Sequence, residues 1–362
     1  MKKTSLALIA ASGLIASLPA VAQSSVTLYG QASIGIAQGK TKTVINGVTT
    51  ETTNRGVMNS NYSGSILGFK GTEDLGGGLK ANFVVEGNVS MDGGASFAFD
   101  RVTMVGLSGS WGALNIGRQY SLVHNILCGA DLDCFSNWST TVHWFVPTYL
   151  PGTVNWRNQF GPIDIGLQAS KGRGTTNGVT KPTKAGGALL RYVSGSSFIG
   201  AAYNYAEGNF DNRKGINLSA GAAGTPAADQ FIVDKGQGYT VAGSYDFGVA
   251  QTYANYVDSK GYPDRDVDSY ARHQQLNLGV AVPVGAVTLG VGYGRNQGEF
   301  VTGGVRTVGS HYTGNNYYAG AVYNFNKGTR LTVRAGVNND RKADSGNSTR
   351  STLVGVDFAH RF

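Results

Sequence analysis

Apolar and polar side chains alternate with a period of two residues along much of this chain. From Val26 to Ile36 the apolar or small side chains occupy the even positions, and a similar alternation recurs at 239–247, 287–294 and 330–337. A period of two places successive side chains on opposite faces of a β-strand, so each stretch predicts a strand with one apolar face and one polar or small face. The chain is therefore expected to be all-β.

The composition excludes several other classes of protein. Glycine accounts for 54 of the 362 residues, proline occurs 8 times, and charged residues make up 14%. Scarce proline and the lack of a three-residue glycine period exclude a collagen-like chain. The many tyrosines and phenylalanines argue against disorder, and so much Gly and Tyr argues against a helical bundle. The chain has a net charge of +8, but its basic residues do not cluster on one predicted helix, so no nucleic-acid partner is expected.

The first 22 residues have the layout of a secretory signal peptide. Lys2 and Lys3 precede an apolar stretch, which ends at the small-residue cleavage motif Ala20-Val21-Ala22. Cleavage there leaves residues 23–362 and lowers the formal charge from +8 to +6, because two lysines are removed. No later apolar run reaches 18 residues, so no membrane-spanning helix is expected. An exported chain of alternating strands can still cross a membrane as a closed barrel.

The connections between the alternating segments favour a membrane barrel over a soluble sandwich. About sixteen segments of about ten to fourteen residues are joined alternately by short and long connections. Gly161-Pro162 is one of the short joins, and 38–60, 121–150, 208–236 and 297–314 are the longest connections. Short turns at one end, long loops at the other and aromatic residues near strand ends are typical of outer-membrane barrels, whose apolar face meets lipid. A soluble β-sandwich would give the same alternation with the apolar face inward.

Four strings carry a family resemblance. They are SSVTLYG at the start of the predicted mature chain, LGFKGTEDLGGGLKANFVVEG at 67–87, RVTMVGLSGSWGALNIGRQ at 101–119, and the C-terminal VGVDFAHRF. They resemble the Gram-negative general porins, especially the betaproteobacterial type. The resemblance implies a sixteen-stranded antiparallel transmembrane β-barrel with short periplasmic turns, long outer loops and a third outer loop folded into the lumen. It also implies a homotrimer in the outer membrane, in contact with lipid and lipopolysaccharide, and Phe362 resembles the signal read by the barrel-insertion machinery.

The connection at 121–150 is expected to be the constriction loop of the lumen. It is the longest connection in the chain, and it is rich in apolar side chains such as Ile126, Leu127, Trp144 and Val146, which favour burial against the inner wall. Its acidic residues are Asp131 and Asp133.

Strand parity predicts which basic side chains face the lumen. Leu67 and Phe69 are expected to face outward, so Lys70 faces inward; the same reasoning, with Val102 and Met104 outward, places Arg101 inward. Outward Val154 and Trp156 likewise place Arg157 inward. These three cations are expected to face Asp131 and Asp133 across the pore, as in the constriction of a porin. Opposed charges of this kind at a narrow passage set the ion selectivity of a channel. The other interpretation is a set of scattered charges on a wet wall.

The surplus of basic groups in this predicted constriction favours a weak preference for anions. One departure from the family pattern limits it: the family usually has Arg before LGFKG, and this chain has Ile66.

Arg118 differs from these cations, because it shares parity with Leu114 and Ile116 and is expected to face outward. A charge facing lipid at mid-membrane costs about 2–4 kcal/mol. Arg118 is therefore expected at a subunit interface, unless it lies at the outer end of its strand and extends its charged group into water.

Cys128 and Cys134 are the two cysteines of the chain, and both lie in the predicted constriction loop. Exported proteins oxidise their thiols, so a disulfide between them is expected. Neither His124 nor His143 lies at a recognised zinc spacing from them, so no metal site is expected.

The sequence predicts a non-specific diffusion channel for small hydrophilic solutes and ions, with no cofactor. Two alternatives stay open. A substrate-specific channel would carry a run of aromatic residues along the lumen, and a barrel enzyme would need paired Asp/His or Ser/His side chains near a rim. Neither feature is recognisable in the sequence, so no enzymatic activity is expected.

Overall fold

The computed structural model describes residues 25–58, 64–93, 97–132, 145–176, 179–208, 233–263, 268–307, 310–343 and 345–362. The predicted signal peptide at 1–22 lies outside these residues. Among the described residues, no helix has the length and apolar character needed to cross a lipid bilayer. The elements are β1 Ser25–Ile45, β2 Val48–Met58, β3 Ser65–Gly76, β4 Leu79–Val89, β5 Thr103–Gly109, β6 Gly112–Tyr120, α1 Leu122–Gly129, β7 Tyr149–Phe160, β8 Ile163–Thr176, β9 Val179–Ser194, β10 Ser197–Glu207, β11 Val233–Asp246, β12 Gln251–Pro263, β13 Tyr270–Val284, β14 Val287–Thr302, β15 Val305–Arg306, β16 Tyr312–Asn324, β17 Thr329–Lys342 and β18 Ser348–Arg361.

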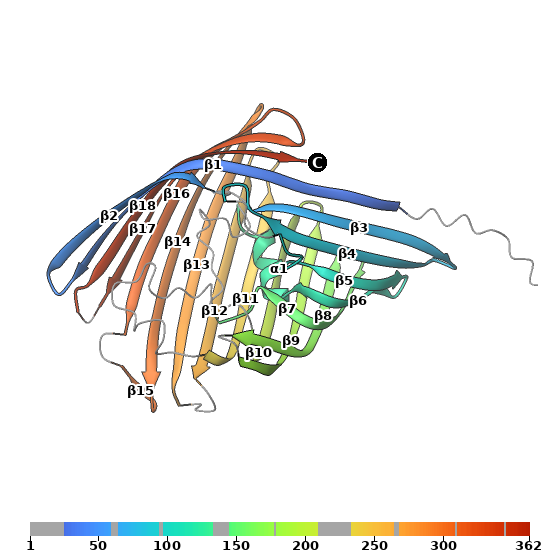
Figure 1. The fold of residues 1–362 in the computed structure, drawn as a ribbon, viewed down its shortest axis with the longest axis horizontal. Helices are drawn as coiled ribbons and strands as arrows, with labels where there is room; N and C mark the ends of the chain where they lie inside the picture. Colours follow the sequence, from blue (N-terminus) through green and yellow to red (C-terminus); the bar gives the residue numbers. More distant parts are fainter. Residues whose placement is uncertain are drawn as a thin grey trace, which may run out of the picture.

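The strands form one antiparallel sheet that closes into a barrel (Figure 1). Eighteen strands are named, but β2 and β3 pair with successive parts of β1 and act as one wall strand. The two-residue β15 pairs only with the end of β14, among the described residues. Counting β2 and β3 as one strand and leaving out β15 gives sixteen wall strands, as the sequence predicts.

The barrel closes where its first and last strands meet. Fourteen residue pairs join β1 to β18, from Gln31 with Arg361 to Val44 with Ser348. The C-terminal Phe362 extends this seam, because its backbone exchanges hydrogen bonds of 3.1 and 3.3 Å with Gly30. Gly30 has no side chain, and a Cβ there would lie 2.8 Å from the Phe362 ring. Pairing of the first and last wall strands removes the two edges that an open sheet would expose, which is the condition for crossing lipid with strands.

The two faces of the wall are apolar outside and polar inside. Outward side chains such as Val105, Ile199 and Val291 are more than half exposed. Inward positions carry polar groups such as Asn204 and Asn255, which are buried inside the barrel. This pattern is the reverse of a soluble sandwich and agrees with an outer face that meets lipid.

Short turns lie at one end of the barrel. Several have glycine with a left-handed backbone, including Gly161 (φ 57°), Gly195 (φ 58°) and Gly285 (φ 61°). Aromatic pairs stand beside this end, with ring centroids 4.6 Å apart for Tyr245 and Phe247 and 4.8 Å apart for Tyr323 and Phe325. The expected aromatic placement near strand ends is confirmed there.

The expectation of a long loop at 38–60 is wrong. β1 and β2 keep pairing up to Ile45 with Val48, and the chain reverses at Asn46 and Gly47, whose φ angles are 51° and 80°. Two successive positive φ angles are those of a type I′ hairpin turn, which Asn-Gly favours. Much of this connection is therefore an extension of the wall.

Candidate functional site

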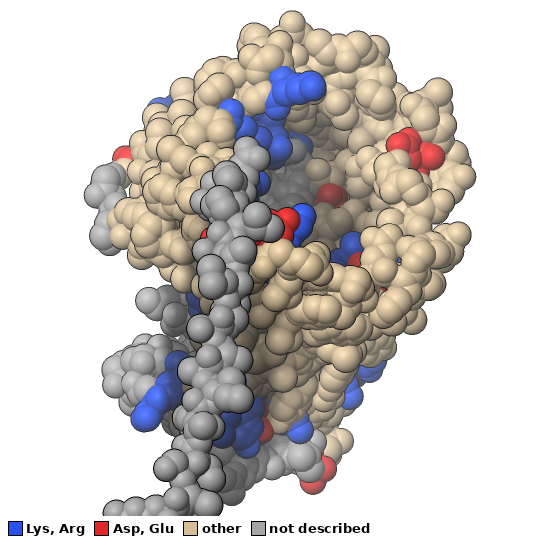
Figure 2. Space-filling model, turned by 90° about the vertical axis from the view of Figure 1, so that its right-hand side faces the viewer, with Lys and Arg blue, Asp and Glu red and all other residues tan. Residues whose placement is uncertain are grey.

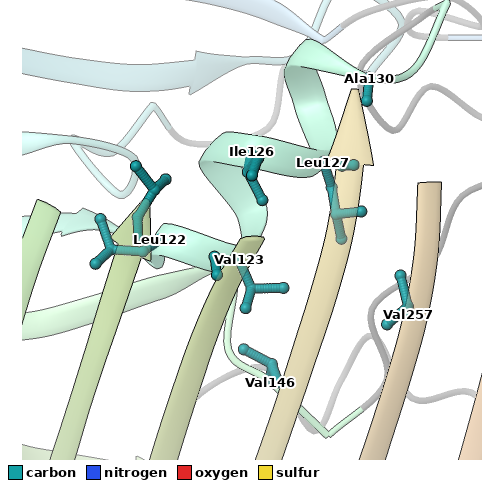
Figure 3. Packing of buried hydrophobic residues seen from close by; sticks show 10 residues of the cluster. Leu122, Val123, Ile126, Leu127, Ala130, Val146 and Val257 are labelled. Carbon is teal, nitrogen blue, oxygen red and sulfur yellow. The ribbon is translucent and has the colours of Figure 1, made fainter. Parts of the chain in front are cut away.

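A short helix, α1, lies inside the barrel directly after β6 (Figure 1). Ser121 caps its N-terminus, because the Ser121 side chain accepts a hydrogen bond from the backbone N–H of His124. Leu122, Val123, Ile126 and Leu127 form the face that packs on the wall, and each is completely buried. Figure 3 shows these side chains pointing toward the strands beneath the helix.

The wall under α1 matches this apolar face. Its inward positions are Leu189 on β9, Ala202 on β10, Ala242 on β11 and Val257 on β12. Small side chains on β10 and β11 let the helix approach the sheet closely. The predicted burial of the segment against the inner wall is confirmed for Ile126, Leu127 and Val146.

Two asparagines fix the helix in position. The Asn204 Oδ1 atom accepts a hydrogen bond of 2.8 Å from the backbone N–H of Val123, and the Asn255 Nδ2 atom donates one of 2.8 Å to the carbonyl of Ala130. Farther along, Leu132 lies close to the next part of the wall, where a Cβ on Gly279 of β13 would be 3.0 Å from its side chain. The segment thus crosses the inner surface from β9 to β13.

The interior around this segment carries charge. Figure 2 shows that the molecule is hollowed on the face turned to the viewer and that basic and acidic side chains lie inside the opening. The strand register identifies which of them face inward. Leu189 beneath α1 pairs with Gly166, which pairs with Arg157, which pairs with Ala113. Arg157 therefore faces inward, as parity predicts.

Arg157 binds a carboxylate of the wall. Its Nε and Nη2 atoms donate hydrogen bonds of 2.9 and 2.7 Å to the two oxygens of Asp164 on β8. Arg191 on β9 donates a further hydrogen bond of 2.7 Å to the same carboxylate. Two guanidinium groups thus share one buried acid, which leaves this part of the wall with a net positive charge.

Arg101 reaches the interior by a different route from the one that parity predicts. The expectation that Met104 faces outward is wrong, because the register pairs Met104 with Val84 on the inward face and leaves Val105 63% exposed. Arg101 precedes β5 and lies outside the regular ladder. Its Nε atom nevertheless donates a hydrogen bond of 2.5 Å to the inward carboxylate of Glu86.

Three aromatic side chains complete the network around Arg101. Its Nη2 atom donates to the hydroxyl of Tyr120 at 2.5 Å, Tyr149 donates to Tyr120 at 3.1 Å, and Tyr29 donates to Glu86 at 2.9 Å. Burial alone would lower the pKa of the Arg101 guanidinium. The electrostatic effects of Tyr120, Tyr149 and Glu86 are larger in sum, so the pKa is raised. Arg101 is therefore charged throughout the ordinary pH range.

Lys70 lies beside this network, with its ammonium group 5.1 Å from the centre of the Tyr29 ring. Lys70 and Arg101 thus belong to one neighbourhood, linked by Tyr29 and Glu86. Arg157 lies elsewhere. It pairs with Ala113 of β6, whereas Thr103, two residues after Arg101, pairs with Arg118, which is five residues farther along β6. Five residues of strand correspond to about 17 Å.

The structure therefore does not gather the three cations into one cluster. Asp131 follows α1 inside the barrel and is half-buried, whereas Asp133 lies outside the described residues. The acids that bind Arg101 and Arg157 are Glu86 and Asp164 on the wall.

Sequence reasoning did not select Asp164 or Arg191. Both have the inward parity of Arg157, so the same parity argument applied to β8 and β9 would have found them.

Arg118 has the outward parity that was predicted, since it pairs with Thr103 and shares the face of Ile116, which is 52% exposed. It lies at the loop end of β6. Its Nε atom donates a hydrogen bond of 2.7 Å to the carbonyl of Asp100, and its guanidinium lies 4.8 Å from the centre of the Tyr149 ring. Its charge is thus held at the rim by groups of its own chain.

Cys128 lies in the last turn of α1 and is not a free thiol. Its predicted partner, Cys134, lies outside the described residues, so the pairing stays a prediction. Within the described ranges, no group of three or more His, Cys, Asp or Glu side chains is arranged to hold a metal ion.

A closed sixteen-stranded barrel with an apolar outside, a polar inside and a segment folded across its interior is the architecture of a channel. A family model described as Gram-negative porin matches residues 5–343. The chain belongs to the Gram-negative porin family. It is an outer-membrane channel that crosses the membrane repeatedly with β-strands, as the resemblance in its sequence implied.

Individual porins agree with this assignment. The chain is 32% identical to outer membrane porin protein 32 of Delftia acidovorans over 299 residues, which are 79% of this chain and 77% of that protein. Its fold matches the solved structure of an anion-selective porin from Comamonas acidovorans, with a TM-score of 0.70, 22% identity and coverage of 94% and 100% of the two chains. It also matches the trimer form of OmpT from Vibrio cholerae, with a TM-score of 0.60, 13% identity and coverage of 94% and 99%.

Proposed function

We propose that this porin assembles as a homotrimer of water-filled channels, each narrowed by the segment 121–150. Small hydrophilic solutes and ions would diffuse through it down their gradients, with a weak preference for anions. The packing of α1 on the inner wall carries this proposal, because a folded segment inside a barrel reduces the open cross-section. The trimer form of the Vibrio cholerae neighbour supports the assembly.

The charges of the wall support the anion preference. Arg157 and Arg191 share the single carboxylate of Asp164, so their neighbourhood has surplus positive charge. A narrow passage with surplus positive charge concentrates anions within about a Debye length, roughly 8–10 Å near physiological salt. The structural neighbour from Comamonas acidovorans is an anion-selective porin, which supports the same sign.

Within this proposal the constriction combines wall cations with acids of the segment. Lys70, Arg101 and Arg157 supply positive charge, and Asp131 and Asp133 oppose it. Glu86 and Asp164 neutralise part of the arginine charge, so the preference is expected to be weak.

Several further roles belong to this proposal. Residues 1–22 direct export and are removed, and Phe362 is read by the barrel-insertion machinery. The outer face contacts membrane lipid and lipopolysaccharide. Transport is passive and uses no cofactor, and we propose no enzymatic activity and no nucleic-acid partner.

Planar-bilayer recordings test this function directly. Purified protein is inserted at low concentration, and the zero-current potential is measured across a tenfold KCl gradient. The proposal expects each insertion to close in three equal steps and the potential to indicate a modest excess of chloride permeability. Single-step closure would contradict the trimer. A clear cation preference would contradict the assignment of the field to the wall arginines.

A further inference from the structure

A cavity of about 400 Å³ lies inside the barrel, between Leu132, which follows α1, and the inner wall formed by β11 to β17. Its lining includes Leu132, Tyr253, Pro283, Tyr318, Arg330 and Arg334. Its volume is within the range of sites that hold small organic molecules, about 300–1,000 Å³.

The cavity lies toward the short-turn end of the barrel. Its lining includes Gln251, Pro283 and Asn324. Each pairs with a residue across or near a short turn, and these partners, Asp246, Thr288 and Arg330, also line the cavity. Leu132 reaches it from the segment that crosses the lumen. A solute moving along the channel would therefore meet this cavity next to the proposed constriction.

Two glycines let large side chains lie flat against its wall. Gly292 pairs with Tyr318, and Gly320 pairs with Arg334. A Cβ on Gly292 would collide with the Tyr318 ring, and a Cβ on Gly320 would lie 2.5 Å from the Cγ atom of Arg334. The Arg334 guanidinium lies 5.9 Å from the centre of the Tyr318 ring. The cation and the aromatic ring thus pack together against the wall that lines the cavity.

The cavity has a positive side. Arg330 and Arg334 line it together with one acid, Asp246. Asp246 is bound within its turn, where it accepts hydrogen bonds of 2.7 Å from the Ser196 hydroxyl and from the Gly248 backbone N–H. The Arg330 Nη2 atom donates to the neutral amide oxygen of Gln31 at 2.9 Å. The two arginines outnumber the single acid among the lining residues, and the buried Asp357 is close to them, since it pairs across the ladder with Thr332, which lies between them on β17.

The cavity also has an apolar side. Leu132, Ala281, Pro283 and Val322 contribute aliphatic surface, and Tyr253 contributes an aromatic ring. Apolar surface gains by contact with an apolar group and gains little from a fully hydrated inorganic anion.

We propose that this cavity is a binding subsite for small carboxylates with an apolar body, of the benzoate class. The carboxylate lies toward Arg330 and Arg334, which form charge-assisted hydrogen bonds with such groups. The apolar body lies against Leu132 and the rings of Tyr253 and Tyr318. This inference rests on the proposed function in one respect, since an anion must be able to enter the channel.

Block of the ion current by three probes tests the subsite. Full-length protein in a planar bilayer is titrated at constant ionic strength with benzoate, with acetate, which lacks the ring, and with benzyl alcohol, which lacks the charge. The proposal expects half-block by benzoate at a concentration at least tenfold below that of acetate, and no block by benzyl alcohol. Equal half-block concentrations for benzoate and acetate would overturn it.

Matched variants locate the site. Arg334→Gln is expected to raise the benzoate half-block concentration about tenfold, which corresponds to about 1.4 kcal/mol. Leu132→Ala, which leaves every wall charge in place, should also raise it. Arg191→Gln removes an inner-wall arginine outside the cavity lining, and it should shift the KCl zero-current potential with less than a twofold effect on benzoate.

The outcomes separate the subsite from the channel's general selectivity. An equal effect of Arg191→Gln and Arg334→Gln on benzoate would overturn the subsite, because general lumen charge would then explain the block. Anion preference in KCl without benzoate block would also overturn it, and would leave the proposed function intact. Leu132→Ala keeps the test decisive if Arg334→Gln does not fold, since an unchanged half-block in that variant contradicts the site.

Discussion

Arg157 and Asp164 form a two-point ion pair across the β7–β8 hairpin, with hydrogen bonds of 2.9 and 2.7 Å. Arg191 binds the same carboxylate from the next strand. One acid thus holds two cations on the inner wall. The sign of the local field depends on that acid, because its removal leaves both guanidinium groups uncompensated.

The first prediction concerns this shared acid. Asp164→Asn keeps the shape of the side chain and removes its charge, so the anion preference should increase. The measurement is the zero-current potential across a tenfold KCl gradient. Arg157→Glu should shift the potential toward cations. Glu51→Gln is the control, because Glu51 is an exposed acid that forms an ion pair with Lys40 in the β1–β2 hairpin, away from the pore. An equal shift of the potential in the control would show that the total charge of the protein, and not the charge of the inner wall, sets the selectivity.

The second prediction concerns the position where the family usually has arginine. Ile66 pairs with Gln31 and Asn88, which places it on the inward face. Ile66→Arg should therefore add a lumen cation and strengthen the anion preference, whereas Ile66→Gln should not. Salt should weaken the effect, because the Debye length falls from about 10 Å at 0.1 M to about 3 Å at 1 M. A shift that persists in 1 M salt would contradict this electrostatic origin.

Much of the fold was predictable because the period-two alternation fixes both the strands and their faces. The strand number and the inward position of Arg157 follow from that pattern alone. The hairpin at 38–60 was missed although Asn46-Gly47 is a strong hairpin signal. There the residues on both sides of the turn are mostly polar, so no apolar face marks the strands.

The charge network was less predictable, because parity fixes a face but not a height along the barrel. Lys70 and Arg157 face inward in the same way, yet they belong to different parts of the wall. Arg101 shows a second limit, because it lies just outside β5, where the alternation no longer applies. Its contact with Glu86 depends on how the chain enters the strand, which only the fold defines.

The third prediction concerns the docking of α1. Ile126→Ala together with Leu127→Ala removes buried contacts with the wall, and each such truncation costs about 2–5 kcal/mol in a well-packed core. The segment should undock while the barrel ladder stays intact, so single-channel conductance and current noise should rise. Ile116→Ala, on the outward face, is the control. Unchanged conductance in the double variant would show that the helix does not narrow the pore.

The fourth prediction concerns assembly. Unheated detergent extracts should migrate as an oligomer that converts to monomer on heating. If Arg118 lies between subunits, Arg118→Ala should lower the conversion temperature. If it only binds Asp100 and Tyr149 at the rim, the temperature should stay the same. A monomer band at all temperatures in the unmodified protein would contradict the trimer itself.

The last prediction concerns Cys128 and Cys134. Both thiols should resist alkylation until a reductant is added, because exported chains oxidise. Cys128 ends a helix that packs on the wall, and a bridge to Cys134 would close a small ring directly after it. Small rings constrain the unfolded chain less than large ones, and the barrel is held by its strand ladder. Reduction should therefore increase current noise while the heat-conversion temperature changes little. Cys128→Ser with Cys134→Ser should reproduce the noise without reductant. Alkylation of both thiols in the untreated protein would show that the bridge does not form.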